Sequence, residues 1–170
     1  SSTPAPCREK IKQALKIIMI GDEKLLNKFI QEFREEFMKL PPEDIAYPRS
    51  CNGVQKFRGE SQLFAKGAPI HVKGAILYNH LVSKNKLENK YPLIQEGDKI
   101  RFLHLRQPNS FQSSSFSFMT KVPKELDIIG KIDYDMQYEK SFLEPLRVIT
   151  DKLQWMLKND EVGSLEDFFG

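Results

Sequence analysis

The feature that most constrains this chain is an amphipathic segment at residues 22–40. Its apolar side chains recur at helical spacing, while Glu32, Glu35 and Glu36 occupy the opposite side. Asp22 is a good N-terminal cap, and Pro41-Pro42 stops a helix. The apolar stripe consists of Leu25, Leu26, Phe29, Ile30, Phe33 and Phe37. The segment is therefore predicted to be a helix that buries one face against the rest of the chain.

Residues 5–20 are predicted to form a second helix beside the first. Ser2 or Thr3 is expected to cap it, and Pro4 or Pro6 suits its first turn. Gly21 ends it. Because only Gly21 and Asp22 join the two helices, we expect an antiparallel pair.

The rest of the chain contains helical and alternating segments that are separate from one another. Helices are predicted at 70–83 and at 133–157, the latter interrupted at Pro145, with a short extended piece at 45–47. Residues 99–106 and 114–120 alternate as strands do and are expected to pair across the loop between them. This segregation predicts an α+β fold, with a helical layer, a small antiparallel sheet and a loop-rich basic segment.

Composition narrows the class of protein. Of the 170 residues 40% are hydrophobic, which is enough for a core, and no apolar run approaches ~18 residues, so no membrane span is expected. Cys7 and Cys51 are interpreted as two reduced thiols. Residues 49–106 carry 11 basic and 4 acidic side chains, a net charge of +7. Such a segment attracts a polyanion, although a solvated basic surface has the same composition.

A search for catalytic constellations predicts no catalytic residue and no metal ligand. The three histidines lack metal-binding spacing, and no phosphate-binding or nucleophile motif occurs. Asp133 and Asp135 form a D-x-D pair that could hold metal ions, but carboxylates in a first helical turn ordinarily act as caps. What remains is a binding surface, because Lys56-Phe57-Arg58, Phe64-Ala65-Lys66 and His71-Val72-Lys73-Gly74 interleave bases with aromatics.

Six segments carry a family resemblance, and they occur in order along essentially the whole chain. They are Ser1-Ser2-Thr3-Pro4 with the Lys-rich helix after it, Ser50-Cys51-Asn52-Gly53-Val54-Gln55-Lys56-Phe57, Pro69-Ile70-His71-Val72-Lys73-Gly74, Leu105-Arg106 with Asn109 and Phe111, Asp133-Tyr134-Asp135 with Glu139-Lys140-Ser141-Phe142 and Pro145-Leu146, and Ser164-Leu165-Glu166-Asp167-Phe168-Phe169-Gly170. Together they resemble the C-terminal thumb region of family B replicative DNA polymerases of T-even-type phages.

The resemblance implies a thumb domain at residues 1–157 and a flexible tail at 158–170 that binds the sliding clamp. It implies that the chain grips primer-template duplex through the phosphate backbone, beside the remainder of the polymerase, in the cytoplasm of an infected bacterial host. No cofactor is expected in this chain, because the carboxylates that hold Mg²⁺ belong to the polymerase palm, upstream of it. The implied duplex-binding residues are Ser50, Lys56, Phe57, Lys66, His71, Lys73, Gly74, Arg106 and Lys140.

Departures from the family pattern predict either a weaker grip on DNA or a grip that uses other residues. Phe57 replaces a Tyr and loses a hydroxyl, and Lys73 replaces an Arg and loses the planar fork. Glu144 stands where close relatives carry a Lys, and the loop 107–115 lacks a family Lys. His71 and Phe57 are also interpretable as core residues.

The tail ends with Leu165, Phe168 and Phe169, which fall on one face of a single helical turn that Ser164 can cap. An apolar pocket on a clamp would hold such a turn, although the two Phe rings could instead fold back onto the thumb. Two alternative functions stay open. One is a clamp-recruited accessory protein, and the other is a small metal-dependent nuclease that uses Asp133, Asp135 and His71.

Overall fold

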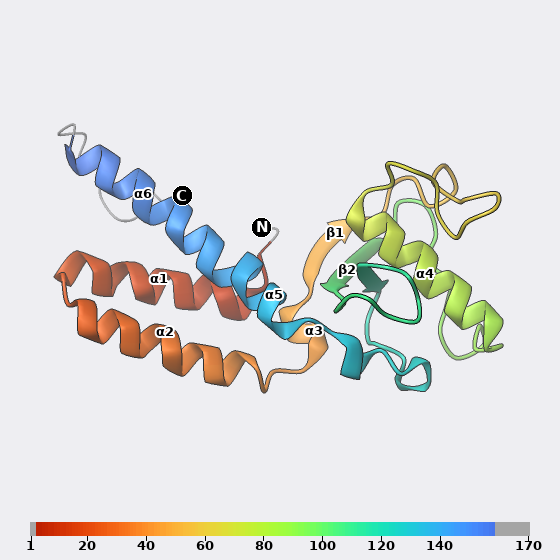
Figure 1. Ribbon diagram of the computed structural model, residues 1–170, viewed down its shortest axis with the longest axis horizontal. Coiled ribbons are helices and arrows are strands. Elements are labelled where there is room, and N and C mark those ends of the chain that lie inside the picture. The colour runs from red at the N-terminus through yellow and green to blue at the C-terminus, as the bar shows by residue number, and fades with distance from the viewer. Residues whose placement is uncertain (1–2, 159–170) are drawn as a thin grey trace.

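The computed structural model describes residues 3–158, and it has two lobes along its long axis (Figure 1). One lobe is helical and the other contains the sheet, yet a single continuous hydrophobic core runs through both. The elements in chain order are α1 (Ala5–Ile20), α2 (Glu23–Phe37), α3 (Pro42–Ile45), β1 (Tyr47–Ser50), α4 (Ile70–Lys84), β2 (Lys99–His104), β3 (Ser115–Phe118), η1 (Lys124–Leu126), η2 (Ile129–Lys131), α5 (Tyr134–Tyr138), η3 (Glu139–Leu143) and α6 (Glu144–Lys158). The predicted α+β class is confirmed.

The helical lobe is built on the hairpin of α1 and α2. Gly21 ends α1 in the left-handed conformation at φ 82°, which glycine adopts at little cost, and Asp22 accepts a hydrogen bond of 3.0 Å from the Leu25 backbone N–H. The predicted cap of α1 is wrong, because Pro4 precedes the helix and no side chain caps it. Helix α2 ends at Phe37, three residues earlier than predicted.

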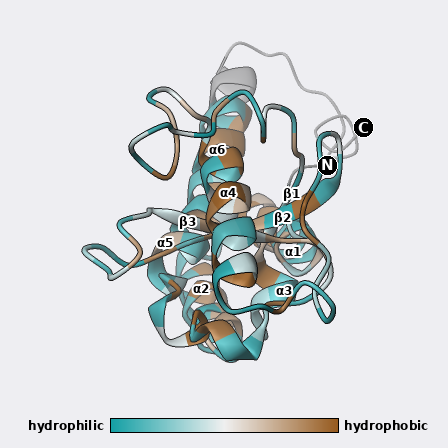
Figure 2. Ribbon diagram, turned by 90° about the vertical axis from the view of Figure 1, so that its right-hand side faces the viewer, coloured by the Kyte–Doolittle hydropathy of each residue, from teal (hydrophilic) through white to brown (hydrophobic). Residues whose placement is uncertain are grey.

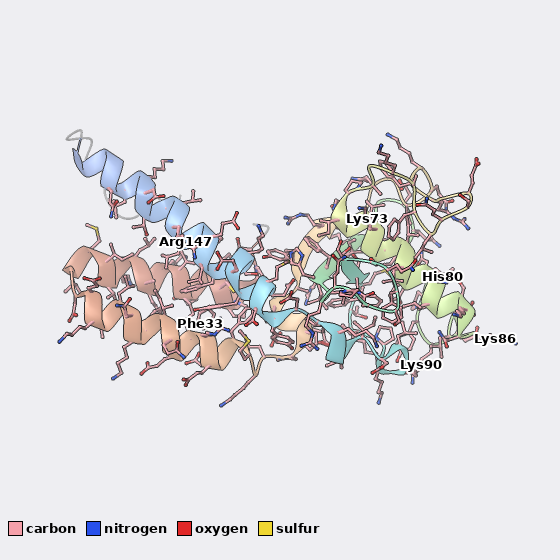
Figure 3. The ribbon with its side chains drawn as sticks, viewed as in Figure 1. Phe33, Lys73, His80, Lys86, Lys90 and Arg147 are labelled. Atoms are coloured by element: carbon pink, nitrogen blue, oxygen red, sulfur yellow. The ribbon has the colours of Figure 1, made fainter. Side chains whose placement is uncertain are left out.

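The stripe of α2 buries Phe33 and Phe37 against the helix that follows the sheet. The Phe33 ring lies edge-on to Phe142 at 4.8 Å and to Tyr138 at 5.9 Å between ring centroids. Edge-to-face contacts of this kind stabilise aromatic clusters beyond simple burial. The cluster joins α2 to residues more than a hundred positions away and so closes the helical lobe, in which Figure 3 labels Phe33.

The helix predicted at 133–157 is continuous past Pro145, so the predicted interruption there is wrong. Proline lacks an N–H and its ring collides with the carbonyl one turn earlier. The chain accommodates this by a π-helical turn, η3, directly before α6, which places Pro145 in the first turn of α6. The helix changes its winding instead of ending.

The sheet has three antiparallel strands in the order β1-β2-β3, one more than predicted. The predicted pair is present, with Leu103 opposite Phe116. The additional strand β1 pairs Tyr47 with Phe102 and contains Pro48, which lacks an amide donor and therefore suits an edge strand. The short extended piece predicted at 45–47 overlaps this strand only at Tyr47, because Ile45 ends α3.

Helix α4 covers β3, and the contact depends on Gly74. An added Cβ there would collide with the Ser117 side chain and lie 2.7 Å from its backbone nitrogen. Ser115 and Ser117 donate hydroxyl hydrogen bonds of 2.6 and 2.8 Å to the carbonyls of Ile70 and His71 in the first turn of α4. The alternation of Ser and Phe in this strand thus has two uses. The serines bind the first turn of α4, and Phe116 packs in the core.

Figure 2 views the molecule from the end that carries α4, and the loops around this helix are coloured mostly as hydrophilic. Within residues 3–158, no helix is long and apolar enough to cross a membrane.

Candidate nucleic-acid interface

The basic loop, residues 51–69, leaves β1 and returns to the start of α4. One carboxylate anchors its beginning, because Glu96 accepts hydrogen bonds of 2.6 and 2.7 Å from the Gly53 N–H and of 2.9 Å from the Val54 N–H. Gly53 adopts φ 105°, and a Cβ there would lie 2.8 Å from the Phe57 ring. A glycine is therefore required both by the backbone and by the close approach of the ring.

Two lysines of this region lie over aromatic rings. Lys56 Nζ is 5.2 Å from the centroid of Phe57, and Lys73 Nζ, from α4, is 5.6 Å from the centroid of Phe64. Both rings are half-buried and pack against the core, and the Ala65 N–H donates to the Phe57 carbonyl at 2.6 Å. Phe57 therefore supports the loop and also lies under a lysine. The cations are held near the surface by their aliphatic stems, where they can meet an anion.

His71 and Ser50 meet where β1 ends beside the first turn of α4. The imidazole is hydrogen-bonded to the backbone of Ser50, and its ring centroid is 6.3 Å from that of Phe102. Burial, followed by the nearby Arg49 guanidinium, lowers the pKa of His71 below its usual 6.5. His71 is thus neutral near pH 7, and it offers hydrogen bonding and packing instead of charge.

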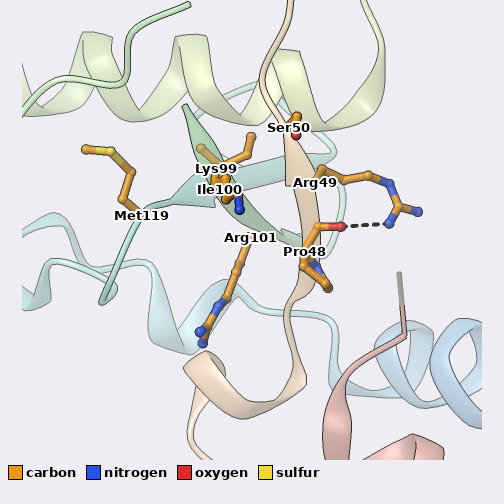
Figure 4. Close-up of a pocket in the computed structure, with 7 residues that line it drawn as sticks. All are labelled: Pro48, Arg49, Ser50, Lys99, Ile100, Arg101 and Met119. Carbon is orange, nitrogen blue, oxygen red and sulfur yellow. Dashed lines mark hydrogen bonds between the residues drawn. The ribbon is translucent and has the colours of Figure 1, made fainter. Parts of the chain in front are cut away.

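A shallow hollow of about 400 Å³ lies on the sheet beside β1 (Figure 4). Arg49 donates to the Pro48 carbonyl at 2.9 Å, and Arg101 donates to the Glu43 carbonyl at 2.9 Å, so the two guanidinium groups point to different sides. The hollow is lined by Pro48, Arg49, Ser50, Lys99, Ile100, Arg101 and Met119. Sequence reasoning missed Arg49, Lys99 and Arg101 as candidates, because only the pairing of β1 with β2 brings them together.

The other predicted residues lie elsewhere or have different neighbours. Lys66 is exposed in the basic loop, whereas Gly74 is buried under β3. Arg106 donates to the Gly130 carbonyl, beyond the far end of β2. Lys140 lies on η3 and forms a half-exposed ion pair of 3.2 Å with Glu144. The structure therefore gathers Ser50, Lys56, Phe57, Lys66, His71 and Lys73 around the basic loop and separates the other three.

The D-x-D carboxylates both have structural partners. Asp133 accepts a hydrogen bond of 2.9 Å from the Met136 N–H and caps α5, and Asp135 pairs with Arg34 at 2.5 Å. The capping interpretation of Asp133 is confirmed. Over residues 3–158, no group of three or more His, Cys, Asp or Glu side chains is arranged to hold a metal ion. The predicted clamp-binding residues Leu165, Phe168 and Phe169 lie outside the described residues.

Comparison with known proteins finds one sequence similarity. The sequence is 28% identical over 174 aligned positions to the DNA-directed DNA polymerase of Escherichia phage RB69. The chain is similar to part of a phage DNA polymerase. The alignment covers 99% of this chain, which spans 18% of that polymerase's length. No protein-family model matches the sequence. The comparison supports a polymerase-related region and a role associated with a polymerase.

Proposed function

We propose that this chain is the duplex-binding thumb portion of a family B DNA polymerase. The observation that carries the proposal is a pair of lysines, Lys56 in the basic loop and Lys73 in the first turn of α4. Each lies over an aromatic ring of the loop, close to Ser50. The similarity of nearly the whole chain to a phage DNA polymerase supports it independently.

A polymerase must hold any sequence equally well, so its grip on the product duplex has to depend on the phosphate backbone. Lysine suits this task as a point charge on a flexible stem, because it follows phosphates without requiring a fixed geometry. The neutral His71 and the Ser50 hydroxyl add hydrogen bonds without adding charge. We propose that Lys56, Lys66 and Lys73 supply the electrostatic part of the affinity.

The catalytic steps belong, in this proposal, to the remainder of the polymerase, whose palm carboxylates hold Mg²⁺. The tail at 158–170 is proposed to bind the sliding clamp through Leu165, Phe168 and Phe169, which keeps the polymerase on DNA. The site of action is then the cytoplasm of an infected bacterium. Deleting residues 164–170 should abolish clamp binding and leave duplex binding nearly unchanged.

The test of duplex binding is fluorescence anisotropy of a labelled duplex of about 20 base pairs at several salt concentrations. Lys56→Ala with Lys73→Ala should weaken binding alike for unrelated sequences and should lower the salt slope by about 0.9 for each phosphate that the variant no longer neutralises. The matched control is Lys24→Ala with Lys39→Ala, which removes the same charge from exposed positions on and just after α2. That control should change the affinity much less.

Two results would overturn the proposal. One is a wild-type chain that binds the clamp and ignores duplex, as an accessory protein would. The other is cleavage of the duplex on addition of Mg²⁺ or Mn²⁺, as a nuclease would show.

A further inference from the structure

Helix α4 carries basic side chains along one face well beyond the basic loop. The helix contains no Asp or Glu, and His80 and Lys84 stand at i+7 and i+11 from Lys73, which places each of them within about 20° of Lys73 around the axis. Figure 3 shows Lys73, His80 and Lys86 following α4 from its first turn to its end. His80 and Lys84 are exposed. The row thus leads away from the site described above.

Lys86 occupies a backbone position at which glycine is the usual residue. It directly follows the C-cap Asn85 and adopts φ 54°, while the Leu87 N–H donates to the Val82 carbonyl at 2.9 Å. This is the Schellman arrangement, in which the left-handed residue is most often glycine because a Cβ is disfavoured there. A lysine at this position strains the fold, and such outliers gather at functional sites.

The Glu125 carboxylate, beside the segment that follows α4, already has partners. Glu125 accepts a hydrogen bond of 2.7 Å from the Tyr91 hydroxyl and pairs with Lys90 at 3.3 Å. Lys121 adds a further cation 5.8 Å from the Tyr91 ring centroid. Among residues 3–158, neither Lys84 nor Lys86 forms an ion pair. Their charges are therefore available to a partner.

We propose that the distal row, His80, Lys84 and Lys86, binds the phosphate backbone of the duplex and extends the contact that begins at Lys73. The inference rests on the proposed function. Eleven helical residues span about 16 Å between Lys73 and Lys84, which is long enough to follow a duplex past more than one phosphate. Because α4 contains no Asp or Glu, this face of the helix is complementary in charge to the continuous polyanion of a nucleic-acid backbone.

The decisive variants are Lys86→Gly and Lys84→Ala, measured by the anisotropy assay on the full chain. Each should lower duplex affinity about fivefold to tenfold near 0.1 M salt and reduce the salt slope by about 0.9, because each removes one phosphate contact. Lys86→Gly should leave the Tm unchanged or raise it by up to about 3 °C, because glycine relieves the left-handed backbone. Weaker binding by a protein that is at least as stable is what separates a binding role from a structural one.

The assay distinguishes a failure of the proposed function from a failure of this extension. A wild-type chain that does not bind duplex at all removes the proposed function and this extension together. If Lys56→Ala with Lys73→Ala weakens binding while Lys84→Ala and Lys86→Gly do not, the extension alone is wrong. If the distal variants keep wild-type duplex binding but no longer bind a poly-glutamate probe, the row serves an acidic protein and the proposal is overturned.

Discussion

Replacing Gly74 by alanine tests how closely α4 approaches β3. The added Cβ would lie 2.7 Å from the Ser117 backbone nitrogen and 2.9 Å from the Phe116 carbonyl carbon. Backbone atoms cannot move aside by changing rotamer, so the helix or the strand must shift. Overpacking of this kind costs about 1–3 kcal/mol, and we take the upper end because two backbone atoms are involved. Alanine recovers about 1 kcal/mol of helix propensity, which leaves a net loss of about 2 kcal/mol.

Urea unfolding followed by circular dichroism measures this loss, and a Tm lower by about 4–8 °C is the thermal equivalent for a chain of this size. Gly130→Ala is the matched control, because nothing lies within 4 Å of a Cβ at that position. The control should change the free energy of unfolding by less than about 0.5 kcal/mol. A Gly74→Ala variant as stable as the wild type would refute the tight contact. It would leave the predicted role of Gly74 in DNA binding as the remaining reason for a glycine there.

Two further predictions concern the pH dependence of folding and the anchoring of the basic loop. Burial lowers the pKa of both His71 and His104, and the nearby Lys140 lowers the pKa of His104 further. As the pH falls, these histidines are therefore protonated in the unfolded chain before they are protonated in the folded one. The free energy of unfolding should thus decrease as the pH drops below 6.5. Lys140→Met should raise the pKa of His104 in an NMR titration and reduce that fall; an unchanged His104 titration would contradict the argument. Glu96→Ala removes the acceptor of the Gly53 and Val54 amides, so it should cost about 1 kcal/mol and weaken duplex binding several-fold, with faster hydrogen exchange at both amides. The direction of the change in duplex affinity is the test, because removing a negative charge by itself would strengthen binding to DNA.

The sequence by itself predicted the helices closely. Residues 5–20 form α1 with the predicted bounds, and α4 differs from its prediction by one residue at its end. These elements depend on apolar spacing and end signals within a few residues, such as Gly21 and the prolines after α2. Local sequence contains that information, and it also located the basic middle segment from which most of the candidate interface is built.

The neighbours of each charged side chain were decided only by tertiary structure. Arg106 donates to the Gly130 carbonyl and lies apart from the basic loop, although composition treats it like Lys73. The edge strand β1 gains its partner only when β2 arrives some fifty residues later, and the hollow around Arg49 and Arg101 follows from that pairing. Contacts between residues far apart in the sequence depend on the path of the whole chain, so they cannot be predicted from the spacing of neighbouring residues. The left-handed backbone conformation of Lys86 is likewise known only from the structure, because the sequence has no glycine to indicate it.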